Sequence, residues 1–265
     1  MWEVPELVRR TRHSLHNCFT SFSSLDLKVL VGIKAELSNP LKDAPDKGIL
    51  NLSVECPAVA SSKFIGRRGD DLANELTQSL QRAFGQGRLN QGCGIDLGAL
   101  CIVKGKACWT IYADCVVLCD GGSLIDALSI GTLVALMTTH LPKVSVVGAD
   151  EEEPEIEVDD DLSESTALDV SNGPVITSVS SIGSCYVVDC TTQEELCATA
   201  SLEVAVNAQG AVNGVSQKHR GTGATASLSP GQIDEMIEFG RGIGMQVAQA
   251  LSQFVVTRGQ TVVIK

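Results

Sequence analysis

Ten cysteines and four histidines are the residues of this chain best suited to bind a transition metal. Zinc sites usually draw their ligands from closely spaced residues, often a C-x-x-C pair. No such pair occurs, and the nearest cysteines, Cys115 and Cys119, flank a Val-Val-Leu run far from any histidine. The sequence therefore argues against a metal site or another cofactor. It favours buried free thiols in a reducing compartment, because a free cysteine packs as a small hydrophobic residue.

The net charge of −12 would oppose binding to a phosphate backbone if it were spread evenly. However, residues 150–164 hold ten acidic residues and no basic one, which leaves a net charge of only −2 on the other 250 residues. This acidic segment has few apolar residues and is predicted to be a solvated linker loop. No apolar run approaches the roughly 18 to 20 residues that a membrane-spanning helix needs, so no membrane partner is expected.

The first half of the chain is predicted to contain strands and two helices. Apolar residues alternate over 27–37 and again over 50–56, which predicts two strands that pair antiparallel. Leucines at helical spacing predict a helix that begins near Asp70 and ends near Phe84. Residues 109–119 are apolar enough for a central strand.

A second helix is predicted to follow Ser123, which forms the pattern of a capping box with Asp126. Beyond the acidic segment, four further strands are predicted, and Ser229 with Gln232 predicts the capped start of the last helix. Gly240 and Gly244 in that helix indicate either close approach of another backbone or tolerated glycines. Both halves thus consist of strands followed by a helix, which predicts an α+β fold with an internal pseudo-repeat. The four strand segments are 174–180, 186–190, 202–207 and 210–217.

Several short motifs stand out along the chain: the segments 29–36, 66–71, 95–97, 120–127, 141–144 and 188–195, together with Glu75, Trp109 and Asp114. Their order and spacing resemble those of the RNase PH family, and the chain most closely resembles the branch that builds the ring of the RNA exosome. The resemblance covers about residues 27–255 and implies two packed β-α halves and a six-membered ring through which single-stranded RNA passes.

The resemblance also indicates that the chain is not an enzyme. Active members cleave RNA from its 3′ end with inorganic phosphate and place an Arg directly after the Ser or Thr of a Gly-Gly-Ser/Thr turn; here that position is Leu124. Leucine offers no charge-assisted hydrogen bond to phosphate. The acids Asp189, Glu194 and Glu195 match a second family segment and could in principle bind a metal. Without the Arg, we expect these vestigial catalytic positions to cap a helix, form ion pairs or lie in a polar turn at a strand end.

Two basic clusters are candidates for RNA binding. Arg67 and Arg68 precede Asp70 and Asp71, so they could face RNA phosphates in the ring channel or pair with these aspartates. Lys218 and Arg220 form the other cluster, for which a solvated loop is the favoured interpretation.

The beginning of the chain departs from the family. Residues 1–26 show neither the Arg-x-Asp-Gly-Arg segment nor the strand pair that family members ordinarily have there, so we predict a non-matching segment, disordered or altered. The domain boundaries expected from this interpretation are 27–148 for the first half, 149–166 for the acidic linker and 167–258 for the second half.

The favoured function is a non-catalytic exosome ring subunit that supports 3′-to-5′ RNA processing and degradation. The implied partners are other RNase PH-like subunits, RNA-binding cap subunits, an associated exonuclease and single-stranded RNA, in the nucleus, nucleolus and cytoplasm. Two alternatives remain open. One is an active phosphate-dependent exoribonuclease, and the other is a truncated isoform that cannot join the ring.

Overall fold

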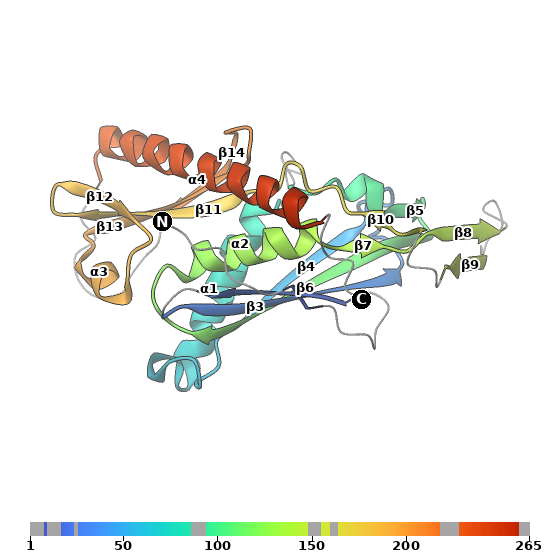
Figure 1. The fold of residues 1–265 in the computed structure, drawn as a ribbon, viewed down its shortest axis with the longest axis horizontal. Helices are drawn as coiled ribbons and strands as arrows, with labels where there is room; N and C mark the ends of the chain where they lie inside the picture. The colour runs from blue at the N-terminus through green and yellow to red at the C-terminus, as the bar shows by residue number, and fades with distance from the viewer. Residues whose placement is uncertain are drawn as a thin grey trace.

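The computed structural model describes residues 8–9, 17–23, 26–85, 94–147, 155–159, 164–217 and 228–259. Figure 1 shows two β-sheets with helices packed against them, the first sheet built from the N-terminal half and the second from the C-terminal half. This arrangement confirms the predicted α+β fold and the division into two β-α halves. No helix in the described part of the chain is long and apolar enough to span a membrane.

The first sheet has its most deeply buried strand in the middle. Strand β6 (Ala107–Cys119) pairs antiparallel with β3 (Lys28–Ser38) and parallel with β4 (Ile49–Glu55). The predicted antiparallel pairing of β3 with β4 is therefore wrong, because β6 lies between them. Residues 107–111 of β6 are buried on both faces, and the neighbours on either side, β3 and β4, pair with the backbone groups along its two edges. A short strand, β5 (Cys101–Val103), also pairs with β6.

The N-terminal segment contributes two strands, contrary to the prediction. Strand β2 (Asn17–Ser23) pairs antiparallel with β3, and β1 (Val8–Arg9) pairs with β2. Residues 17–23 were not predicted as a strand because polar residues are mixed with the apolar ones and leave no clear alternation. Its position follows instead from the unpaired N–H and C=O groups along the edge of β3, which β2 satisfies. The remaining residues of 1–26 lie largely outside the described ranges.

Four helical segments in the described residues belong to the first half, two α-helices and two 3₁₀ turns. A 3₁₀ turn, η1 (Ser62–Phe64), precedes α1 (Arg67–Ala83), whose buried face packs on β4. Helix α2 (Leu124–Met137) is buried on most sides, as predicted, because it lies between β3 of the first sheet and the second sheet. A second 3₁₀ turn, η2 (Leu97–Leu100), leads into β5.

The acidic segment is not a loop throughout. Strand β9 (Glu155–Val158) pairs antiparallel with β8 (Val144–Val147), and β10 (Thr166–Ala167) pairs with β7 (His140–Leu141). The prediction of a linker without elements is wrong for these residues. Their pairing supplies backbone hydrogen bonds that do not depend on an apolar core, which is why hydrophobic patterning did not reveal it.

The second sheet has the strand order β12-β11-β13-β14, with antiparallel pairing throughout. Helix α3 (Thr192–Cys197) follows β12, and α4 (Pro230–Gly259) packs on β11 and β13. The predicted cap of α4 is confirmed, since Ser229 N–H donates to Gln232 Oε1 at 3.0 Å and Gln232 N–H donates to Ser229 Oγ at 3.3 Å. The strands are β11 (Val175–Ile182), β12 (Cys185–Val188), β13 (Ala200–Val206) and β14 (Val212–Gln217).

The glycines of α4 permit close helix–sheet packing. A Cβ on Gly240 would lie 3.0 Å from side-chain atoms of Val179 and Val204, and one on Gly244 would lie 3.0 Å from Thr177 Oγ1. The close-approach interpretation is therefore confirmed. Residues of α2, β3, β11 and α4 belong to one buried apolar cluster, so the two halves share a core.

Eight of the cysteines in the described part of the chain are shown to be free thiols. Cys56, Cys108, Cys115 and Cys190 are buried, as predicted for cysteines that act as packing residues. Burial raises the pKa of Cys115 to about 11. Cys185 and Cys197 are exposed, so the prediction of buried thiols holds for only some of the cysteines.

Candidate functional site

The turn between β6 and α2 contains the residues that match the phosphate-binding motif of the family. Ser123, the residue before α2, has a left-handed backbone with φ of 45°, and its side chain does not cap the helix, so the predicted capping box is wrong. Gly122 has φ of 102°, and a Cβ there would lie 2.3 Å from the Cys190 carbonyl oxygen. Only glycine fits this position, because any side chain would collide with the backbone of the second half.

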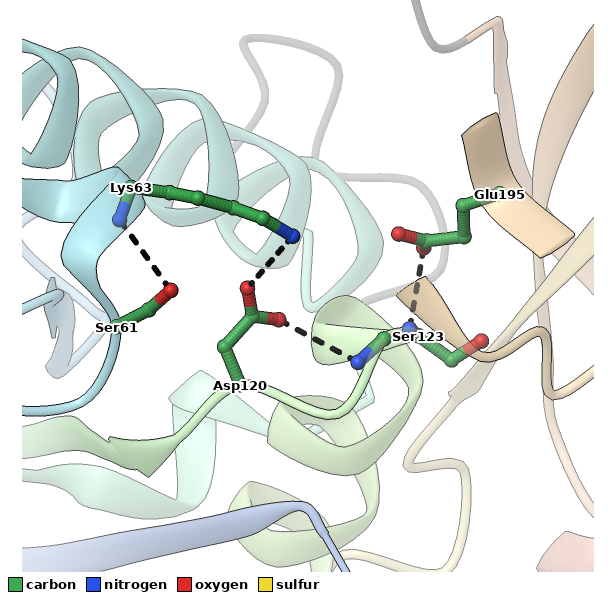
Figure 2. Close-up of polar contacts among 6 residues, drawn as sticks. Ser61, Lys63, Asp120, Ser123 and Glu195 are labelled. Atoms are coloured by element: carbon green, nitrogen blue, oxygen red, sulfur yellow. Dashed lines mark hydrogen bonds and ion pairs between the residues drawn. The ribbon is translucent and has the colours of Figure 1, made fainter. Parts of the chain in front are cut away.

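Three hydrogen bonds hold this turn against residues that follow β12. Thr192 N–H donates to the carbonyl oxygen of Gly121 at 3.1 Å. Ser123 Oγ donates to the Cys190 carbonyl at 3.1 Å, and Ser123 N–H donates to Glu195 Oε1, also at 3.1 Å. Figure 2 shows the last contact, with the Glu195 side chain reaching from the second half to the start of α2.

Asp120 supports the same turn from the side of the first half. Its Oδ1 accepts the Gly122 N–H at 3.3 Å, and its Oδ2 lies 3.7 Å from Lys63 Nζ (Figure 2). The Asp120 side chain is 8% exposed and that of Lys63 is 54% exposed. Lys63 was not predicted as a site residue. The only indication in the sequence is that it is a basic residue shortly before Arg67 and Arg68.

Leu124, the first residue of α2, belongs to the core. It is 7% exposed and joins the apolar cluster shared by the two halves. In the resemblance to active family members, this position holds the phosphate-binding Arg. Here the side chain packs among apolar residues and carries no charge, so it offers no hydrogen-bond donor to an anion.

The acids Asp189, Glu194 and Glu195 have different surroundings. Glu194 accepts hydrogen bonds from the N–H and Oγ of Thr191 at 2.8 and 2.9 Å, which forms a capping box at the start of α3 and lowers the pKa of Glu194. Asp189 has φ of 54° in the polar turn after β12. Although this residue is exposed as a whole, partial desolvation of its carboxyl and then the charge of Glu194 raise its pKa. The expectation of a capping role is confirmed for Glu194.

Carboxylates dominate the surroundings of the turn. Asp120 and Glu195 accept hydrogen bonds from its backbone, and Asp126 lies in the first turn of α2. Of the described basic residues, Lys63 is the one whose ion pair reaches this group. Within the described ranges, no group of three or more His, Cys, Asp and Glu residues has the arrangement to hold a metal ion. The side chains that contact the backbone of this turn are therefore acidic, with Lys63 paired to one of them.

Two of the four basic residues predicted to bind RNA lie within the described ranges. Arg67 Nε lies 3.9 Å from Asp71 Oδ1, and the Arg67 side chain is 91% exposed. A pair this long and this exposed contributes little, and it leaves the guanidinium accessible to another anion. Arg68 is exposed and forms no ion pair with a described residue. Lys218 and Arg220 lie outside the described residues, so their assignment stays a prediction.

Models of the two domains of the 3′ exoribonuclease family match the chain. Domain 1, RNase_PH, matches residues 16–142, and domain 2, RNase_PH_C, matches residues 172–243. Together they cover more than half of the chain, which therefore belongs to the RNase PH family. The first match begins before residue 27, in agreement with the position of β2 and contrary to the expected start of the resemblance.

Similar proteins with assigned names indicate which branch of the RNase PH family this chain resembles. The Exosome complex component Rrp42 of Thermococcus kodakarensis is 35% identical over 74% of this chain and 68% of its own length. The Exosome complex component Rrp42 of Methanocella arvoryzae is 30% identical over 82% of this chain and 74% of its own length. The chain is thus similar to the Rrp42 branch of the family, which confirms the resemblance to exosome ring proteins.

Solved structures confirm the fold. A chain from a structure titled "archaeoglobus fulgidus exosome with RNA bound to the active site" has a TM-score of 0.70, 20% identity, and coverage of 94% of this chain and 87% of that chain. A chain of an archaeal exosome core has a TM-score of 0.68 at 19% identity, with coverage of 94% and 86%. At this level of identity, the likeness shows the RNase PH fold.

Proposed function

We propose that this chain is a non-catalytic ring subunit of the RNA exosome that contributes wall and RNA-path surface to 3′-to-5′ RNA processing. The supporting observation is Leu124, buried at the start of α2 where active members of the family place the phosphate-binding Arg. Membership of the RNase PH family and relatives named Exosome complex component Rrp42 support the assembly part of the proposal.

The substitution is large enough to matter for catalysis. Phosphorolysis needs cationic stabilisation of an incoming phosphate and of the charge that develops in the transition state. A charge-assisted hydrogen bond from Arg is worth about 1.5 to 3 kcal/mol, and its loss in a transition state can reach on the order of a hundredfold or more in rate. Among the described residues, Lys63 is the cation paired with an acid of this turn, and its ammonium group faces the carboxylate of Asp120.

The proposed lack of catalytic activity is tested with the full chain, both alone and mixed with the neighbouring RNase PH-type subunits. Single-stranded RNA is incubated with inorganic phosphate and Mg²⁺, and released nucleoside diphosphates are measured. We expect no phosphate-dependent release by this chain. Release that requires phosphate and disappears in the Asp189→Asn variant would overturn the proposal, because it would show that the vestigial acids still function.

Ring assembly is tested by size-exclusion chromatography of the chain mixed with a neighbouring family subunit. The expected result is co-elution as a larger species, because the sheet edge at β3 is covered by β2 and the two halves share one core. Separate elution of folded chains would favour an isoform unable to join the ring. The proposed function implies two further kinds of partner, the cap subunits and an associated exonuclease. It also implies residence in the nucleus, nucleolus and cytoplasm. Both implications fail if the proposed function is wrong.

The RNA path is tested at the Arg67–Arg68 pair. Replacing both residues with Ala is expected to weaken RNA crosslinking to the assembled ring and to leave assembly intact, because both side chains are exposed at the start of α1. Arg241→Ala is the matched control, since Arg241 is an exposed arginine on α4 that pairs with Glu238 at 2.8 Å. Unchanged crosslinking in the double variant would indicate that Arg67 and Arg68 have a structural role and do not contact RNA.

A further inference from the structure

We propose that Glu195 acts as an internal anion at the start of α2 and keeps the Gly121–Ser123 turn closed to inorganic phosphate. This inference rests on the proposed function and adds a second cause of inactivity beside Leu124. A carboxylate of the chain's own second half takes the hydrogen-bond donor that a phosphate oxygen would need. The loss of phosphate binding is therefore built into the packing of the two halves as well as into the missing Arg.

The first support is the contact itself. Ser123 N–H donates to Glu195 Oε1 at 3.1 Å, and this N–H lies at the end of a helix of 14 residues, where the helix dipole favours negative charge. An anion is thus already bound at this position of the molecule. A phosphate could use the same N–H only if the Glu195 carboxylate moved away.

The second support is that the backbone beneath Glu195 is held in place. Ser123 Oγ donates to the Cys190 carbonyl, and Thr192 N–H donates to the Gly121 carbonyl. Gly122 approaches the Cys190 carbonyl so closely that even a Cβ would collide with it. Because the turn and residues 190–192 are fixed against each other, the backbone keeps the Glu195 carboxylate within reach of the Ser123 N–H while the halves stay packed.

The third support is the difference between neighbouring acids. The Glu194 carboxylate is directed to Thr191 and caps α3, so it belongs to its own helix. The Glu195 carboxylate instead crosses to Ser123, which is 72 residues away in sequence. The Glu194 carboxylate therefore caps α3, whereas the Glu195 carboxylate blocks the Gly121–Ser123 turn.

The test uses the isotopically labelled full chain and inorganic phosphate as the probe, with the Ser123 amide resonance as the readout. In the Glu195→Ala variant we expect a saturable phosphate-dependent shift of this resonance, with an affinity at least about tenfold higher than that of the unaltered chain at the same ionic strength. Glu194→Gln is the matched control. It removes the adjacent charge but keeps a residue that can complete the capping box, so its response should equal that of the unaltered chain.

Two outcomes would overturn the inference. One is an unchanged Ser123 resonance in Glu195→Ala, and the other is an equal shift in the unaltered chain. If Glu195→Ala does not fold, Glu195→Met replaces it, because a side chain of similar length keeps the packing but offers no oxygen to accept the Ser123 N–H. Adding Leu124→Arg then separates the two causes of inactivity: phosphate affinity should rise further when both changes are present than with Leu124→Arg alone. Nucleoside diphosphate release by the unaltered chain would instead defeat the proposed function itself.

Discussion

The carboxylate of Asp126 accepts the backbone N–H of Ser178, with 3.0 Å from the nitrogen to each carboxylate oxygen. Ser178 Oγ donates to the same carboxylate. Asp126 lies in α2 of the first half and Ser178 in β11 of the second, so one side chain joins the two family domains. The residue that the sequence suggested as a capping partner for Ser123 thus stabilises the contact between the halves.

Asp126→Ala is expected to lower the free energy of unfolding by about 1.5 to 3 kcal/mol, because hydrogen bonds to a charged acceptor are worth that much. Urea denaturation followed by circular dichroism measures the change. Asp234→Ala, at an exposed position of α4, should change stability by less than about 0.5 kcal/mol. Equal effects of the two variants would show that Asp126 does not link the halves.

Gly122→Ala should destabilise the protein much more than Gly105→Ala. Both glycines have positive φ, at 102° and 76°, so both substitutions carry backbone strain of about 1 to 2 kcal/mol. Only at Gly122 would the new Cβ meet backbone atoms, whereas nothing lies within 4 Å at Gly105. We expect a further loss of about 1 to 3 kcal/mol at Gly122 from this overlap, measured by chemical denaturation. Similar losses at the two positions would contradict the close packing of the turn on residues 190–192.

Glu194 should titrate below the ordinary glutamate value. Hydrogen bonds from Thr191 stabilise its ionised form and lower its pKa in the folded state. Its contribution to stability is therefore complete above the ordinary pKa and is lost as the pH falls through the lowered pKa. Carboxyl-carbon NMR measures this titration, and Thr191→Ala, which removes the side-chain donor, should move the pKa upward. A Glu194 pKa at or above the ordinary value would rule out the charged cap.

Thiol reactivity should follow burial. Cys185 and Cys197 are exposed and should react first with iodoacetamide, whereas Cys108 and Cys115 should stay protected in the folded protein. Burial raises the pKa of Cys115 to about 11, so very little of its reactive thiolate is present at neutral pH. Mass spectrometry of timed digests gives the order of labelling, and unfolding in urea should abolish the difference. Early modification of Cys115 without unfolding would contradict its place in the core.

Some local features of this protein were predictable from its sequence. The Ser229 and Gln232 cap and the burial of α2 depend on residues near one another or on the spacing of apolar side chains. The family motifs also identified Leu124 as the departure that argues against catalysis. Each of these signals is contained in a short stretch of residues, which is why pattern and spacing were sufficient.

Only the tertiary structure decided which distant segments meet. The position of β6 between β3 and β4 and the pairing of β2 with β3 depend on competition among strands for hydrogen-bond partners, which no single segment encodes. The same holds for Glu195: its sequence neighbours suggest a cap like that of Glu194, yet its carboxylate bonds to Ser123 across the halves. The sequence by itself determined the family and the missing phosphate-binding Arg, whereas folding of the two halves onto each other placed a carboxylate at the start of α2.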